Sequence, residues 1–211
     1  MMNAIFGRRA FHAAGLLAGA ALGLAGASFA ASKADYPGYG GDQGATRYSE
    51  LTLINKANVG KLVQAWRFDM PAGGLQVQPI IVDGVLYATT TDGKVVALDA
   101  ATGALKWSTA FPGAGGGRGR GLTFWRSGTD RRILVPGGAF VYEINADTGQ
   151  LIPSFGDGGK IDLRLQLRGD DPARNLINIG TPPSLYGDIF ITAGGVPDTS
   201  PHDATVAQLV E

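Results

Sequence analysis

The side chains that could do chemistry on their own are few. The 211 residues contain no cysteine and two histidines, so thiolate sites and disulfides are excluded. His12 lies in an N-terminal stretch that we expect to be removed, which leaves His202. A histidine-based zinc site or a Ser-His-Asp triad is therefore not expected. Redox chemistry by this chain would need a bound cofactor.

Two arginines, Arg118 and Arg120, lie in a glycine-rich stretch, residues 113–121. A phosphate-binding or RNA-binding loop is one interpretation, but the stretch has no GxGxxG register and no following Lys-Ser/Thr pair. After removal of residues 1–30, the chain has 16 basic and 18 acidic side chains. That balance argues against binding to nucleic acid or to an anionic bilayer.

Residues 1–30 predict an export signal. Arg8 and Arg9 form a positive start, an uncharged stretch rich in alanine and glycine follows, and Ser28 and Ala30 place small residues where a signal peptidase cleaves. Residues 7–11 also resemble a twin-arginine signal, without its usual Ser/Thr before the pair. The stretch is too weakly apolar for a stable membrane span. We expect cleavage after Ala30 and a periplasmic location.

The elements that must position any site are short strands separated by turns. Residues 80–82 and 85–91 are β-prone runs around Asp83-Gly84, and a second Asp-Gly pair, Asp92-Gly93, precedes residues 94–98. Both pairs are predicted to form two-residue type I′ turns. A third reversal is predicted at residues 99–103, before a strand that starts at residue 104. The pattern indicates a four-stranded antiparallel meander, which cannot bury both of its faces alone.

This unit recurs along the chain. Residues 95–105 (VVALDAATGAL) align without a gap with residues 141–151 (VYEINADTGQL), and residues 79–89 align with residues 183–193. Repeated four-stranded units are typical of β-propeller blades. A β-sandwich would explain the strands but not the ungapped repeat.

We therefore expect an all-β fold, a partial β-propeller with about two complete four-stranded blades and parts of two more. The blades are predicted at residues 76–111 and about 120–156, the first two strands of another at 181–195, and a lone outer strand at 62–68. A closed ring needs about 4–8 blades, so this chain is not expected to close one.

Several ordered motifs carry a family resemblance: residues 40–51 (GGDQGATRYSEL), 97–107 (ALDAATGALKW), 120–125 (RGLTFW) and 153–164 (PSFGDGGKIDLR). Together they resemble the N-terminal part of pyrroloquinoline quinone (PQQ)-dependent alcohol and glucose dehydrogenases, over about residues 36–201. The resemblance implies that residues 31–211 are an incomplete part of an eight-bladed propeller that holds PQQ and Ca²⁺ near its axis. It also implies that Trp107 docks between neighbouring blades.

The resemblance assigns candidate cofactor contacts. Arg120 occupies an Arg-Gly position whose arginine contacts PQQ in the family, and a guanidinium suits the carboxylates of this planar tricarboxylate. Gln76 stands where alcohol-oxidising members often have a glutamate that touches the cofactor. Thr181 lies at or next to a threonine that reaches PQQ. The alternatives are a solvated loop arginine for Arg120 and an ordinary strand residue for Gln76.

The resemblance also suggests one metal ligand. Asp198 lies in residues 194–199, a stretch that resembles the Asp-Asn of glucose-oxidising relatives near their metal, with Thr199 in place of the asparagine. Ca²⁺ prefers hard oxygen ligands, although an Asp after Pro is also a common turn residue. The family's catalytic aspartate is expected beyond the end of this chain, so no residue here is assigned to catalysis.

The function implied is oxidation of a sugar, polyol or alcohol by hydride transfer to PQQ, with cytochrome c or a quinone as electron acceptor. The absence of adjacent cysteines near Arg120 favours the glucose or polyol branch. We expect the isolated chain to be inactive. The alternative is a non-catalytic periplasmic scaffold built from the same repeat, but such scaffolds are usually lipoproteins, and a chain without cysteine cannot be lipidated at its N-terminus.

Overall fold

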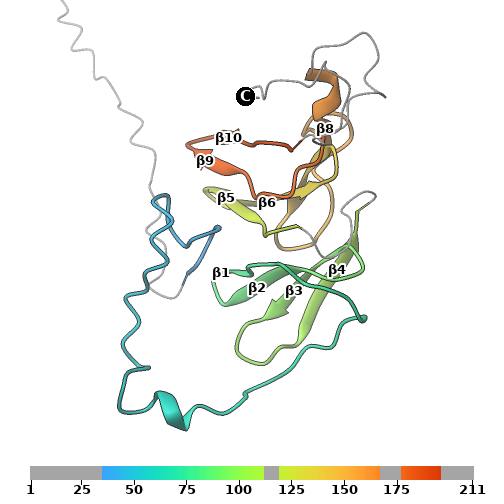
Figure 1. Cartoon of the computed structure of the whole chain (residues 1–211). Coiled ribbons are helices and arrows are strands. Elements are labelled where there is room, and N and C mark those ends of the chain that lie inside the picture. Colours follow the sequence, from blue (N-terminus) through green and yellow to red (C-terminus); the bar gives the residue numbers. More distant parts are fainter. Residues whose placement is uncertain (1–34, 112–118, 167–176, 196–211) are drawn as a thin grey trace, which may run out of the picture.

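The computed structural model describes residues 35–111, 119–166 and 177–195, which form three antiparallel sheets in chain order (Figure 1). The first sheet contains β1 (Ile80–Val82), β2 (Val85–Thr89), β3 (Lys94–Asp99) and β4 (Leu105–Ala110). The second contains β5 (Thr123–Ser127), β6 (Asp130–Gly137), β7 (Phe140–Asn145) and β8 (Lys160–Asp162). The third contains β9 (Ser184–Tyr186) and β10 (Ile189–Ile191), and two short 3₁₀ helices complete the elements, η1 (Val59–Lys61) and η2 (Leu163–Gln166).

Each strand pairs with the next one along the chain, from β1 to β4 and from β5 to β8. The predicted all-β fold, with two four-stranded blades and the first strands of another, is confirmed. No helix in the described ranges is long and apolar enough to cross a membrane.

The two Asp-Gly turns behave differently. Asp83 and Gly84 both have positive φ, 50° and 73°, as a type I′ turn requires. The second connection runs over residues 90–93, and Gly93 alone among these has positive φ (78°). The prediction of a second type I′ turn was therefore wrong. A four-residue loop can reverse the chain with only its last residue, the glycine, in the left-handed conformation.

The repeated turn is the same structure in both blades. Oδ1 of Asp99 accepts hydrogen bonds from the Thr102 N–H (2.9 Å) and hydroxyl (2.8 Å). Oδ1 of Asn145 accepts the matching bonds from the Thr148 N–H (3.0 Å) and hydroxyl (3.2 Å). Both turns end on a glycine in the left-handed region, Gly103 (φ 72°) and Gly149 (φ 71°). The sequence repeat is thus a structural repeat.

The second blade extends past its predicted end near residue 156. Leu151, which matches the first residue of β4, makes only an isolated bridge to Ile144 before the chain leaves the sheet. Pro153 has no N–H to continue the ladder, and glycines with positive φ at positions 156, 158 and 159 reverse the chain. Pairing with β7 resumes at β8, so the boundary predicted at 156 was too early.

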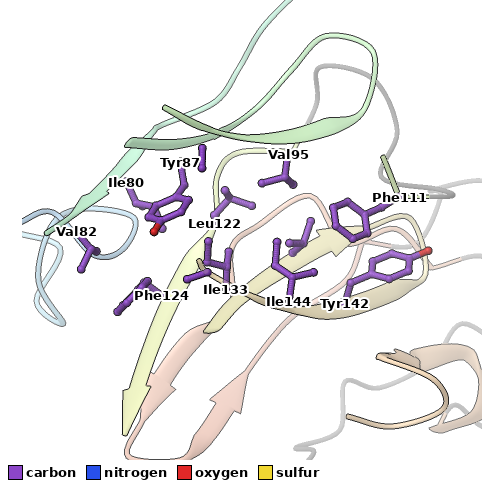
Figure 2. Packing of buried hydrophobic residues seen from close by; sticks show 13 residues of the cluster. Ile80, Val82, Tyr87, Val95, Phe111, Leu122, Phe124, Ile133, Tyr142 and Ile144 are labelled. Atoms are coloured by element: carbon purple, nitrogen blue, oxygen red, sulfur yellow. The ribbon is translucent and has the colours of Figure 1, made fainter. Parts of the chain in front are cut away.

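The sheets pack face to face. Alternate side chains of β3 point to opposite faces, so Val95 lies in the cluster between the first and second sheets and Val96 lies on the far side. Figure 2 shows Tyr87 and Val95 from the first sheet facing Ile133 and Ile144 from the second. The second sheet buries its other face too, against the unit that contains β9 and β10. This arrangement of stacked sheets is that of propeller blades.

The predicted outer strand at residues 62–68 does not form, since no strand of the described part lies beside it. Trp66 and Phe68 instead pack on the outer face of the first sheet. In Figure 1 the chain shortly before them, light blue to teal and containing η1, extends away from the sheets. That stretch exposes apolar side chains, among them Leu51, Leu53, Ile54, Leu62 and Val63.

Candidate functional site

Tryptophans fix the position of one sheet against the next. Trp107 on β4 donates its Nε1–H to the Ala146 carbonyl of the following turn (3.0 Å). Its ring lies against Gly149, where an added Cβ would come within 2.6 Å of the ring. Trp66 makes the same bond to the Ala100 carbonyl (3.1 Å), over Gly103. The docking of Trp107 between neighbouring blades is therefore confirmed.

Three segments that precede the first strands of consecutive sheets lie side by side. We call them the leading segments: residues 75–78, 120–121 and 180–181. The Gln78 N–H donates to the Arg120 carbonyl (3.0 Å), and the Arg120 N–H donates to the Gly180 carbonyl (2.9 Å). Gly121 has φ 153°, and a Cβ there would lie 3.0 Å from the Gln78 carbonyl oxygen. The close approach of these segments therefore requires glycine at this position.

Gln76 and Arg120, two of the candidate cofactor contacts, line one pocket of about 480 Å³. Both side chains are exposed. The other lining residues are Tyr39, Arg47, Leu75, Val77 and Gln78. The described lining residues therefore offer two guanidinium groups and two primary amides, and none of them is a carboxylate. Arg120 forms no ion pair with a carboxylate of the described residues.

This set of donors fits a flat molecule with several carboxylates. Guanidinium groups bind carboxylates through paired N–H donors, and amide N–H groups can add further hydrogen bonds. Tyr39 supplies an aromatic face beside them. The residues present are thus compatible with PQQ, a planar tricarboxylate.

Thr181 lies in a different pocket, of about 530 Å³, which is also lined by Phe124, Asp42 and Pro183. Tyr39 lines both pockets. The structure therefore brings Thr181 close to Arg120 along the backbone, through the bond to Gly180, but does not place the two side chains in one pocket.

The metal prediction falls outside the described residues, because Asp198 and His202 both lie beyond residue 195. Within the described ranges, no group of three or more His, Asp or Glu side chains could hold a metal ion. Ca²⁺ binding by Asp198 stays a prediction.

Most acidic side chains that form ion pairs lie in or between the sheets and away from the pocket. Asp83, in the β1–β2 turn, pairs with Arg126 and Arg131 of the second sheet. Burial raises the pKa of Glu143, and its ion pair with Arg132 opposes that shift. None of these residues lines either pocket. We interpret them as structural.

Sequence reasoning missed the polar lining residues Tyr39, Arg47 and Gln78. Arg47 and Tyr39 belong to or adjoin the motif at 40–51, which carried the resemblance without any assigned role. Gln78 is two residues after Gln76, so period-2 alternation could have placed both amides on one side of the leading segment.

The chain is similar in sequence to known alcohol and glucose dehydrogenases. The chain is 40% identical over 132 residues to the dehydrogenase subunit of the quinone alcohol dehydrogenase of Gluconobacter oxydans, which covers 56% of this chain and 16% of that protein. It is 28% identical over 193 residues to the quinoprotein glucose dehydrogenase of Escherichia coli, covering 78% of this chain and 24% of that protein. The chain thus spans less than a quarter of the length of these relatives.

Solved structures agree on the fold. The quinohemoprotein alcohol dehydrogenase of Comamonas testosteroni superimposes with a TM-score of 0.62 at 24% identity, over 77% of this chain and 23% of that one. A second quinohemoprotein alcohol dehydrogenase, from Pseudomonas putida HK5, gives a TM-score of 0.61 at 27% identity, over 78% and 23%. A family model described as the glucose/ethanol/alcohol dehydrogenase β-propeller domain matches residues 36–209. The repeated blades, the docked tryptophans and this match show that the chain belongs to the PQQ-dependent dehydrogenase family, as part of its β-propeller.

Proposed function

We propose that this chain forms a cofactor-binding part of an exported PQQ-dependent dehydrogenase that oxidises a sugar, polyol or alcohol. The main support is the meeting of Gln76 and Arg120, from the leading segments of consecutive blades, in a pocket that no carboxylate of the described residues lines. Family membership supports PQQ as the group bound there. The periplasmic location follows from the signal predicted at residues 1–30.

Arg120 would bind a carboxylate of the cofactor through paired N–H donors. The Gln76 side-chain amide would donate a further hydrogen bond, and the Thr181 hydroxyl would contact the group from the neighbouring pocket. When bound, PQQ supplies an ortho-quinone that accepts hydride. Ca²⁺, with Asp198 among its oxygen ligands, belongs to the same proposal.

The base that takes the substrate's hydroxyl proton must come from elsewhere, because no carboxylate lines the pocket that holds Arg120 among the described residues. We therefore propose that the 211 residues bind PQQ without turning over substrate. In the whole protein, cytochrome c or a quinone would take the electrons. The missing cysteine pair favours a sugar or polyol over a simple alcohol.

Equilibrium dialysis of the chain with PQQ, with and without Ca²⁺, tests the binding role. Arg120→Gln removes a charge-assisted contact and should weaken binding by about 10- to 100-fold. Arg67→Gln is the matched control, because Arg67 is an exposed arginine paired with Asp69 and lines neither pocket. Binding that is absent in the unaltered chain, or equal in the chain and in R120Q, would contradict the proposal.

A further inference from the structure

We propose that Arg47 is a second anion-binding residue of the pocket that contains Arg120, so that the two guanidinium groups clamp a ligand with at least two carboxylates. The inference rests on the proposed function insofar as that ligand is PQQ. No motif assigned a role to Arg47. Its position on the N-terminal segment, far from Arg120 in the sequence, makes the pairing a consequence of the fold.

The segment at residues 36–47, which we call the arch, is attached to the first two sheets. Tyr36 and Ile81 exchange two backbone hydrogen bonds (2.6 and 2.9 Å), and the Phe124 N–H donates to the Pro37 carbonyl (3.1 Å). The arch thus joins β1 to β5 directly beside the leading segments. A residue carried by the arch is therefore fixed relative to Arg120.

The arch is closed by its own hydrogen bonds. The Arg47 N–H donates to the Gly40 carbonyl (2.8 Å), and the Thr46 N–H donates to Asp42 Oδ1 (2.9 Å). Gly40 and Gly41 both have positive φ, and a Cβ on either would meet its neighbours at 2.6 Å. The backbone at Arg47 is consequently held in one conformation.

That conformation is unfavourable for arginine. Arg47 has φ 56°, in the left-handed region that costs free energy for a residue with a Cβ and that glycine adopts freely. The strained residue is exposed, so no burial of its side chain compensates. Ala45 in the same segment also has positive φ (51°), so the strain belongs to the turn, and the role of the Arg47 side chain rests on its place in the pocket.

The guanidinium group of Arg47 is directed by Tyr39. Its Nη2 donates to the Tyr39 hydroxyl (3.3 Å), and the guanidinium carbon Cζ lies 5.7 Å from the centroid of the Tyr39 ring. Arg47 forms no ion pair with a carboxylate of the described residues, and the nearby Asp42 accepts its bonds from Thr46. Among the described residues, the pocket is lined by two guanidinium groups and by no Asp or Glu, so an anionic ligand bound there could pair with both.

The test measures binding of two probes, PQQ and benzene-1,2,4-tricarboxylate, to the chain and to three variants. Arg47→Gln should weaken binding of both probes by about tenfold or more, as expected for loss of a charged partner. It should also reduce the dependence of binding on salt concentration. Arg67→Gln, the matched exposed control, should leave both affinities unchanged.

Arg47→Gly separates binding from folding. Because glycine suits a φ of 56°, this variant should unfold at the same temperature as the unaltered chain or at a higher one, and should still bind both probes about tenfold or more weakly. Loss of affinity together with a lower unfolding temperature in both Arg47 variants would overturn the proposal, since a structural role would explain it.

The outcomes distinguish this inference from the proposed function. If PQQ binding depends on Arg120 but Arg47→Gln binds like the unaltered chain, the second arginine has no role and the proposed function survives. If the tricarboxylate binds with dependence on Arg47 while PQQ does not bind, the clamp stands and the proposed function fails. If neither probe binds, both are wrong.

Discussion

Single glycines allow the tryptophans to join consecutive blades. The ring of Trp107 can reach the Ala146 carbonyl because Gly149 carries no side chain, and Thr109 adds a bond to the Gly149 carbonyl (2.9 Å). A side chain at position 149 would have to displace the ring. The contact between the first and second sheets thus depends on the absence of a Cβ at Gly149.

Replacing Gly149 by alanine should destabilise the chain more than the same change at Gly128. Both glycines have positive φ, 71° and 59°, so both variants carry the left-handed penalty of about 1–2 kcal/mol. Only at position 149 does the new Cβ meet a ring, whereas position 128 is open. We expect an additional loss of about 1–3 kcal/mol for G149A in urea unfolding. Equal losses would show that the docking contact contributes nothing.

The sequence identified some site residues and missed others for a physical reason. Arg120 and Gln76 were candidates because each stands at a position that the family resemblance links to a cofactor contact. Arg47 was missed because its approach to the pocket depends on the arch, whose glycine conformations and closing hydrogen bonds no periodicity indicates. Thr181 stays a predicted cofactor contact, and the separate pocket that it lines could not be predicted.

The turn that begins at Asp99 is the best-defined local element. Hydrogen bonds from the Thr102 hydroxyl and N–H lower the pKa of Asp99 below its usual 3.8. A carboxyl whose pKa is lowered by folding contributes stability above its unfolded pKa and loses it as pH falls through the folded value. The first blade should therefore carry an acid-sensitive contribution that the second blade, with Asn145, does not.

Asp99→Asn should remove that sensitivity. The free energy of unfolding at neutral pH should stay close to that of the unaltered chain, because Asn145 makes the same contacts in the second blade. Between pH ~4 and ~2, the variant should lose less stability than the unaltered chain, as followed by urea unfolding. Asn145→Asp is the reciprocal control and should add acid sensitivity. An unchanged acid slope in D99N would contradict this interpretation.

The type of turn was predictable where two residues form the whole loop. It was not predictable where the loop is longer. Asp83-Gly84 forms the type I′ turn that its dipeptide indicates. At Asp92-Gly93 the loop also includes Thr90. The Thr90 hydroxyl donates to Asp92 (2.5 Å) and accepts a hydrogen bond from the Lys94 N–H (3.1 Å). The late start of β8 has a similar origin, since Pro153 interrupts pairing that the repeat predicted to continue.

The whole molecule is a stack in which the second sheet is buried on both faces. The stack brings the leading segments of consecutive blades together beside the arch, and the site exists only because of that arrangement. Neither pocket is formed by one blade alone, since each combines the N-terminal segment with at least one leading segment. We therefore expect the cofactor to bind where these segments meet.

Hydrogen–deuterium exchange of the 211-residue chain with and without PQQ tests that expectation most directly. We predict slower exchange on addition of PQQ in residues 75–78, 120–121 and 180–181 and in the arch, with no change in the distant turn at Gly128. Protection confined to other regions, or no protection at PQQ concentrations that saturate binding, would contradict the account.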